Sequence, residues 1–75
     1  MMLPWQIEIM TRVCRHPGMW TTTLMAGHLE TPRPRIAARV QSLRRTGFIT
    51  ARSHALRPPQ AGRLAFEAST ERPTE

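Results

Sequence analysis

The sequence contains no lysine, aspartate, asparagine or tyrosine, and only one cysteine and five acidic residues among its 75 positions. The single cysteine, Cys14, excludes an internal disulfide and is compatible with a reducing cytoplasm. No apolar run is long enough to span a bilayer, and the first residues lack the basic segment of a signal peptide. We therefore expect a cytoplasmic protein without membrane contact.

The shortage of carboxylates and of clustered metal ligands argues against catalysis. Three of the five glutamates lie in residues 67–75, so a carboxylate pair for general acid–base chemistry is not expected. Cys14 and His16 have no further ligands nearby, and His28 and His54 stand alone. We predict that the chain is not an enzyme and has no metal site, cofactor or small-molecule ligand.

The positive charge is concentrated in one half of the chain. The formal net charge is +6, and residues 31–66 hold eight arginines and no acidic residue, whereas residues 1–30 are neutral overall. Residues 67–75 sum to −2. Such a distribution favours a polyanionic partner, and a solvated basic surface without function is the alternative.

The first predicted helix runs from Pro4 to about Arg15 and ends at His-Pro-Gly, residues 16–18. Its apolar arc is wide, and Ile7 lies at the edge of it. The arc itself is formed by Trp5, Ile9, Met10, Val13 and Cys14. A wide arc is typical of a helix covered on two sides, by its own domain or by a second copy, and we expect a homodimer through this helix.

A second, shorter helix follows an extended piece at residues 19–20. Thr21 or Thr22 can cap it, and it runs to about residue 29. The residues expected on its apolar face are Leu24, Met25, Ala26 and Leu29. Gly27 costs about 1 kcal/mol relative to alanine in a helix, so we expect the third helix to pack closely against it.

A third helix is predicted over residues 33–46, with Thr31 as its cap and prolines in its first turn. Its buried face is formed by Ile36, Val40 and Leu43. Gly47 ends it where a left-handed residue is favoured. Residues 48–51 then form a short strand, and residues 54–56 return beside it. At about 100° per residue, the side chains that point away from the core are Arg35, Ala38, Gln41, Ser42 and Arg45, flanked by Arg39 and Arg44.

This order of elements resembles the winged helix-turn-helix superfamily of DNA-binding domains. Residues 25–29, Met-Ala-x-x-Leu with threonines one turn ahead, resemble the T-x-x-x-L-A-x-x-L pattern that opens many helix-turn-helix units. Leu43-x-x-x-Gly47-x-Ile49 is common at the end of the recognition helix in this superfamily.

The segment after the hairpin is similar to one in the MarR-like and PadR-like regulators. Residues 56–64 resemble the L-T-x-x-G-R sequence that leads into a last helix, with Arg57 in place of threonine and Pro58-Pro59 in place of the usual cap. We expect that helix over residues 59–68, with its inner face formed by Ala61, Leu64, Ala65 and Ala68. MarR-like and PadR-like proteins carry extra helices for dimerisation or ligand sensing, for which 75 residues leave no room.

The resemblance implies a mainly α fold with a small β-hairpin: a three-helix core, a short wing and a C-terminal helix. The domain would span residues 1–68, followed by a flexible tail at 69–75. The recognition helix, about 33–46, would enter the major groove, and the wing, about 48–57, would lie on the backbone. Arg35 or Arg39 would contact guanine, whereas Arg44 with Arg45, Arg52 and Arg57 would bind phosphates. The expected DNA-binding residues are Thr22, Arg33, Arg35, Ala38, Arg39, Gln41, Ser42, Arg45, Arg52, His54 and Arg57.

The function that follows is sequence-specific binding of double-stranded DNA by a small, nucleoid-associated transcriptional regulator, of a size typical of phages and mobile elements. Two alternatives stay open: a winged-helix interaction module that binds an acidic protein in a transcription or replication assembly, and an RNA-binding winged helix. The exposed face of residues 35–45 is basic and hydrogen-bonding rather than apolar, which favours nucleic acid.

Overall fold

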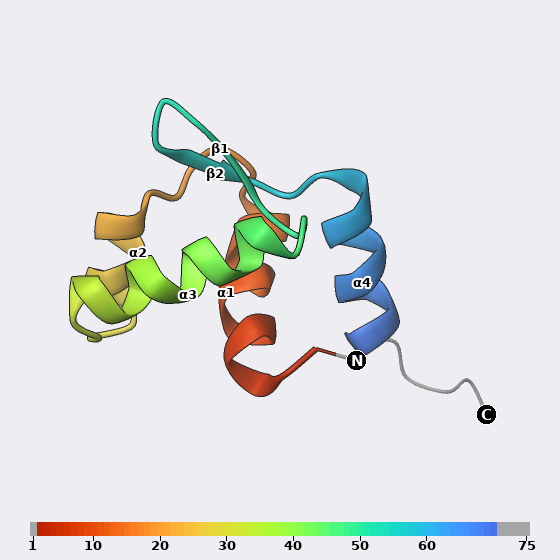
Figure 1. Cartoon of the computed structure of the whole chain (residues 1–75), viewed down its shortest axis with the longest axis horizontal. Helices are drawn as coiled ribbons and strands as arrows, with labels where there is room; N and C mark the ends of the chain where they lie inside the picture. Colours follow the sequence, from red (N-terminus) through yellow and green to blue (C-terminus); the bar gives the residue numbers. More distant parts are fainter. Residues whose placement is uncertain (1, 71–75) are drawn as a thin grey trace.

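A computed structural model of the chain describes residues 2–70, which form helices and a two-stranded hairpin. The elements follow one another as α1 (Pro4–Arg15), α2 (Thr22–His28), α3 (Arg33–Arg45), β1 (Thr50–Arg52), β2 (Ala55–Arg57) and α4 (Gln60–Thr70). α2 packs on α3 at one end of the molecule, α4 packs along α1 at the other, and the hairpin extends from between them (Figure 1). The mainly α fold with a small hairpin is confirmed.

α1 has the predicted bounds because local signals define both of its ends. Pro4 is in the first turn, and the Gln6 side chain accepts a hydrogen bond from the backbone N–H of Leu3, with a donor–acceptor distance of 2.7 Å. The N–H of His16 donates to the carbonyl of Arg12 at the other end. Ile9, Met10 and Val13 are fully buried.

The wide apolar arc of α1 is covered within the domain. α4 packs along this helix, and Ile7 and Cys14 are half-buried against the core. Trp5 is also half-buried, under the guanidinium of Arg39 from α3. A dimer through α1 stays a prediction, but the width of the arc no longer requires one.

α2 is capped by Thr21, whose hydroxyl accepts a hydrogen bond from the N–H of Leu24 at 3.2 Å. Its inner face is narrower than predicted: Met25 and Ala26 are buried, but Leu24 is 56% exposed. The expected close packing against Gly27 is also wrong, because a Cβ atom there would have no neighbour within 4 Å.

α3 starts without a side-chain cap. Thr31 does not cap it, because its hydroxyl donates to the carbonyl of Leu29 instead, and the N–H groups of the first turn bond to the carbonyl of Pro32. The predicted inner face is confirmed, since Ile36, Val40 and Leu43 are all buried.

The end of α3 explains why the first strand begins later than predicted. Gly47 has φ +83°, and the N–H of Phe48 reaches back to the carbonyl of Leu43 at 2.9 Å. Phe48 is therefore part of the helix cap and is not available to the sheet. As a result β1 covers Thr50–Arg52 rather than residues 48–51, and β2 covers Ala55–Arg57 rather than 54–56.

The hairpin is antiparallel, with Ala51 opposite Leu56 and Arg52 opposite Ala55. A bridge between Trp20 and Leu56 adds the predicted extended piece as a short third partner. Both residues of the tip have positive φ, +50° for Ser53 and +69° for His54, the backbone of the tight turns whose twist matches that of paired strands. Residues other than glycine rarely adopt a backbone with positive φ, so the tip carries local strain.

α4 presents a different face to the core from the predicted one. Gly62 is buried and Ala65 and Phe66 are half-buried, whereas Leu64 is 56% exposed and Ala61 and Ala68 are exposed. The reason is a close approach, since a Cβ atom on Gly62 would lie 2.1 Å from the carbonyl oxygen of Phe48. The face with Gly62, which has no Cβ atom, therefore packs against the end of α3.

The helix continues to Thr70, two residues beyond the predicted end. The backbone N–H of Met2 donates to the hydroxyl of Ser69 at 2.9 Å, which ties the start of the chain to the last turn of α4. Residues 71–75 of the expected tail lie outside the described residues. Within residues 2–70, no helix has the length and apolar character needed to cross a membrane.

Candidate nucleic-acid interface

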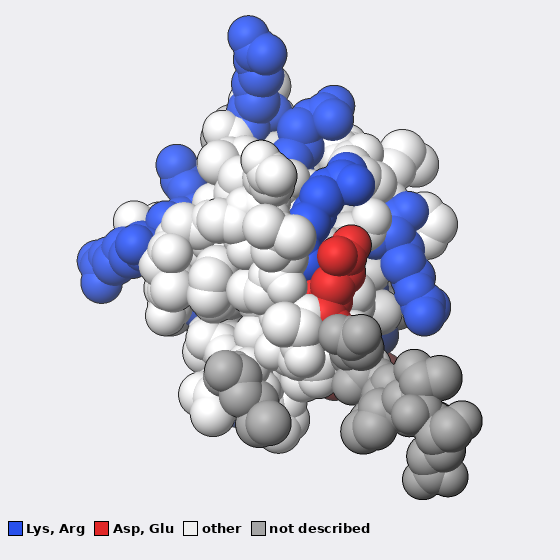
Figure 2. Space-filling model, turned by 90° about the vertical axis from the view of Figure 1, so that its right-hand side faces the viewer, with Lys and Arg blue, Asp and Glu red and all other residues white. Residues whose placement is uncertain are grey.

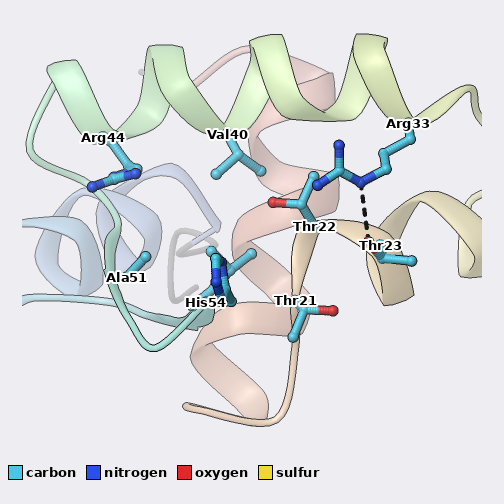
Figure 3. A pocket seen from close by; sticks show the side chains of 9 residues that line it. Thr21, Thr22, Thr23, Arg33, Val40, Arg44, Ala51 and His54 are labelled. Atoms are coloured by element: carbon cyan, nitrogen blue, oxygen red, sulfur yellow. Dashed lines mark hydrogen bonds between the residues drawn. The ribbon is translucent and has the colours of Figure 1, made fainter.

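A groove of about 130 Å³ lies where the start of α2, one flank of α3 and the hairpin meet (Figure 3). Its polar walls come from all three elements, and its floor includes the buried side chains of Val40 and Leu56. None of the described residues that line it carries a carboxylate. The remaining lining residues are Thr21, Thr22, Thr23, Arg33, Arg44, Ala51 and His54.

The two arginines of the groove come from opposite ends of α3. Arg33 is in the first turn, and its Nε donates to the hydroxyl of Thr23 at 3.0 Å (Figure 3). This bond uses one of the five N–H donors of the guanidinium and fixes its direction, so four donors remain for a ligand. Arg44 is in the last turn, three turns along the helix, and its side chain lies near Ala51 of β1. The groove therefore has an arginine at each end, and the two Cα atoms are roughly 16 Å apart along the helix axis.

The exposed face of α3 lies beside this groove. Ala38, Gln41 and Arg45 point away from the buried face, as predicted, and all three are exposed. Arg35 and Ser42 are also exposed, and they lie on the flank of α3 away from the groove. At about 100° per residue, Arg35 is on the opposite side of the helix from Arg44, and Ser42 is on the opposite side from Arg33. The exposed face of α3 thus presents the amide of Gln41, the hydroxyl of Ser42 and the two guanidinium groups of Arg35 and Arg45 to solvent.

Arg39 has a partner within the domain. Its guanidinium carbon lies 5.7 Å from the centre of the Trp5 ring, within the range of a cation–π interaction, and the residue is half-buried. This contact directs Arg39 toward α1, on the flank of α3 away from the groove. Of the two arginines expected to contact guanine, Arg35 is thus the freely exposed one.

The predicted wing residues separate into two groups. His54 lines the groove, and Arg52 is exposed at the end of β1, next to the hairpin tip. Arg57 lies at the base of the hairpin, where its guanidinium lies against the backbone of Gly18: a Cβ atom on that glycine would be 2.6 Å from it. Arg57 is absent from the groove lining.

The opposite end of the molecule has a different charge pattern. In the view toward this end, several arginine side chains project around the outline, and one lies nearer the middle, directly beside an acidic side chain (Figure 2). Among the described residues, basic and acidic charge thus lie side by side on this end.

Neither metal chemistry nor a reactive thiol is favoured in the described part of the chain. No group of three or more potential metal ligands is found among residues 2–70. Cys14 is half-buried, and desolvation by burial raises the pKa of its thiol, an effect opposed by Arg63 and reinforced by Glu67. The thiol is thus protonated at neutral pH, unlike the thiolate of a nucleophilic cysteine.

Four of the nine residues that line the groove were assigned to DNA from the sequence, but their arrangement was not predicted; they are Thr22, Arg33, Arg44 and His54. The bond between Arg33 and Thr23 joins residues ten positions apart on different helices, so no local pattern predicts it. The only available signal was the run of three threonines at the start of α2.

The helix-turn-helix pair α2–α3, the hairpin that follows it and α4 on α1 define a winged helix-turn-helix domain. The chain is similar to the solved structure of the transcriptional repressor CouR bound to p-coumaroyl-CoA, with 24% sequence identity and a TM-score of 0.81. The similarity covers 92% of this chain and 51% of CouR, so the chain spans about half the length of that protein. No protein-family profile matches the sequence, and neither does any curated protein.

Proposed function

We propose that this winged helix-turn-helix domain binds double-stranded DNA sequence-specifically, as a transcriptional regulator of the cytoplasm and nucleoid. The observation that carries the proposal is the convergence of Arg33, Arg44 and His54 with three threonines in one groove without a carboxylate. The fold similarity to a transcriptional repressor agrees with this function.

The groove is suited to the DNA backbone. Its guanidinium and hydroxyl groups match the oxygen acceptors of phosphate, and Arg33 is already oriented by Thr23. Arg52, at the tip of the hairpin, would add a contact to a neighbouring phosphate. These residues fix the position of the protein on the duplex but carry no sequence information.

The exposed face of α3 is suited to base edges. Gln41 can make a bidentate contact to adenine, and Arg35 or Arg45 can make one to guanine. Ala38 has the size to lie against a thymine methyl group, and Ser42 can serve either as donor or as acceptor. Because Arg39 is engaged by Trp5, we assign it a positioning role for α3 rather than a base contact.

A selection of binding sites from random duplexes tests the proposal, followed by affinity measurements on the selected and scrambled sites. We expect Arg45→Ala to weaken the selected site by about 1–3 kcal/mol and to relax the preference at one base pair. Arg33→Ala should weaken both sites equally. Arg63→Ala, which removes the same charge from α4, is the control and should have little effect.

Three results would reject the proposal. A selection that yields no common sequence would remove specificity, and tighter binding of hairpin or single-stranded RNA than of duplex DNA would assign the domain to RNA. If neither nucleic acid binds at low salt, the basic groove would instead serve an acidic protein partner.

A further inference from the structure

A second cleft lies on the side of α2 away from the groove. It has a volume of about 390 Å³ and is lined by His16, Met19, Trp20, Leu24 and His28. At about 100° per residue, His28 points to a side of α2 about 140° away from Thr23, which binds Arg33. The two sites are therefore separated by the helix itself, and a ligand in one leaves the other open.

The cleft exposes apolar surface next to an aromatic ring. Met19 is 70% exposed and Leu24 is 56% exposed. Trp20 lies between them in the lining, with its ring edge-on to His28 at 5.1 Å between ring centres. Single exposed apolar residues are common on proteins, but apolar residues gathered at a cleft are typical of interaction sites.

The rim of the cleft is basic. An adjoining hollow of about 280 Å³ shares His16, Trp20 and His28 with it and adds Thr11, Arg12 and Arg15. Among residues 2–70, no carboxylate lines either hollow. Within residues 2–70, the buried side-chain donors that lack an acceptor are Arg12 Nε and Trp20 Nε1, and both residues line the hollow. Both atoms are shielded from solvent, and Nη1 of Arg12 donates to the carbonyl of Glu8 at 2.7 Å. The basic charge that a ligand can reach at this rim is therefore chiefly that of Arg15, which is exposed.

We propose that this cleft docks a short segment of another protein that combines apolar and acidic side chains. An apolar side chain of the segment would pack on Trp20 and Leu24, while its carboxylates would face Arg12 and Arg15. Charge complementarity selects this occupant over the same cleft of a second copy, since Arg12 and Arg15 of each copy would then meet described lining residues that include no carboxylate. The proposal does not depend on DNA binding, and both ligands can be bound together.

The test is a selection from a displayed library of random 12-residue peptides on the intact chain, followed by fluorescence anisotropy with the enriched peptides. We expect enriched peptides to hold a large apolar residue next to glutamate or aspartate. Replacing the acidic residues by lysine in these peptides should weaken binding at least tenfold, because it brings like charges together at Arg12 and Arg15.

Matched variants locate the site. Leu24→Ser should reduce peptide affinity at least tenfold, whereas Leu64→Ser changes a leucine of equal exposure, 56%, on α4 and should leave it unchanged. Arg15→Ala should weaken binding and Arg45→Ala should not. Circular dichroism melts of each variant separate loss of binding from loss of folding.

Three outcomes would overturn the proposal: enriched peptides without acidic residues, equal effects of Leu24→Ser and Leu64→Ser, or no enrichment. Sedimentation that shows a dimer abolished by Leu24→Ser would assign the cleft to a second copy and would also overturn it. None of these measurements uses DNA, so they can be made even if the domain does not bind DNA. The peptide-docking proposal and the DNA-binding proposal can therefore be rejected independently.

Discussion

Two glycines in helices of this domain should respond in opposite ways to the same substitution. Gly62 in α4 and Gly27 in α2 are both helical, and alanine is favoured over glycine in a helix interior by up to about 1 kcal/mol. At Gly27 the added Cβ would have no neighbour within 4 Å, so the gain is available. At Gly62 it would lie 2.1 Å from the carbonyl oxygen and 2.8 Å from the carbonyl carbon of Phe48.

The size of the effect at Gly62 follows from what has to move. Ordinary contact requires at least 3.4 Å, and the obstructing atoms are backbone, so α4 must shift away from the end of α3. Overpacking of this kind costs about 1–3 kcal/mol, and a backbone obstruction belongs at the upper end. After the gain in helix propensity, we expect Gly62→Ala to destabilise the domain by about 2 kcal/mol, which lowers Tm by about 8–16 °C for a domain of this size.

Thermal melts followed by circular dichroism measure both variants under identical conditions. Gly27→Ala should raise Tm by up to about 4–8 °C, since it adds up to about 1 kcal/mol. A Gly62→Ala protein that melts at or above the wild-type temperature would refute the close approach of α4 to Phe48. A large loss of stability in Gly27→Ala would refute the open surroundings of that residue.

Three further predictions concern other parts of the domain. Arg39→Ala should lower the free energy of unfolding by about 0.5–1 kcal/mol through loss of the contact with Trp5, and urea titration measures it. Replacing the hairpin tip by Asn-Gly (Ser53→Asn with His54→Gly) should raise Tm, because these residues adopt positive φ readily, although it removes His54 from the groove. Cys14 should react with iodoacetamide at pH 8 at least tenfold more slowly in the folded than in the urea-unfolded chain. Burial raises the pKa of the Cys14 thiol in the folded chain above its ordinary value. The protonated thiol therefore contributes to the stability of the fold at pH values below the ordinary thiol pKa, and this contribution is lost as pH rises through the pKa of the folded state.

The sequence was sufficient for features set by local chemistry. The bounds of α1, the buried positions Ile36, Val40 and Leu43, and the left-handed Gly47 each depend on proline, glycine or helical spacing within one segment. The order of these segments was enough to predict the winged helix-turn-helix fold.

Features set by contacts between segments could not be predicted in this way. In α4 the apolar spacing favoured Ala61, Leu64 and Ala68 as the inner face, but a close approach to Phe48 selects the face with Gly62. Arg39 was assigned to a base contact because it lies in the first half of the third helix, the part that approaches base edges in this fold. Whether such an arginine points to solvent or to a neighbouring helix depends on the Trp5 ring, which is distant in sequence.

The salt dependence of duplex binding shows whether the groove and the exposed face of α3 bind the DNA backbone and bases. Anisotropy titrations of a labelled duplex at several KCl concentrations give the slope of log K against log salt. If Arg33, Arg44 and Arg52 each neutralise a phosphate, the slope is about −3. Arg33→Ala combined with Arg44→Ala should reduce the magnitude of the slope by about two, and Arg63→Ala should leave it unchanged. A slope near zero, or an equal loss from Arg63→Ala and from the groove variant, would contradict this mode of binding.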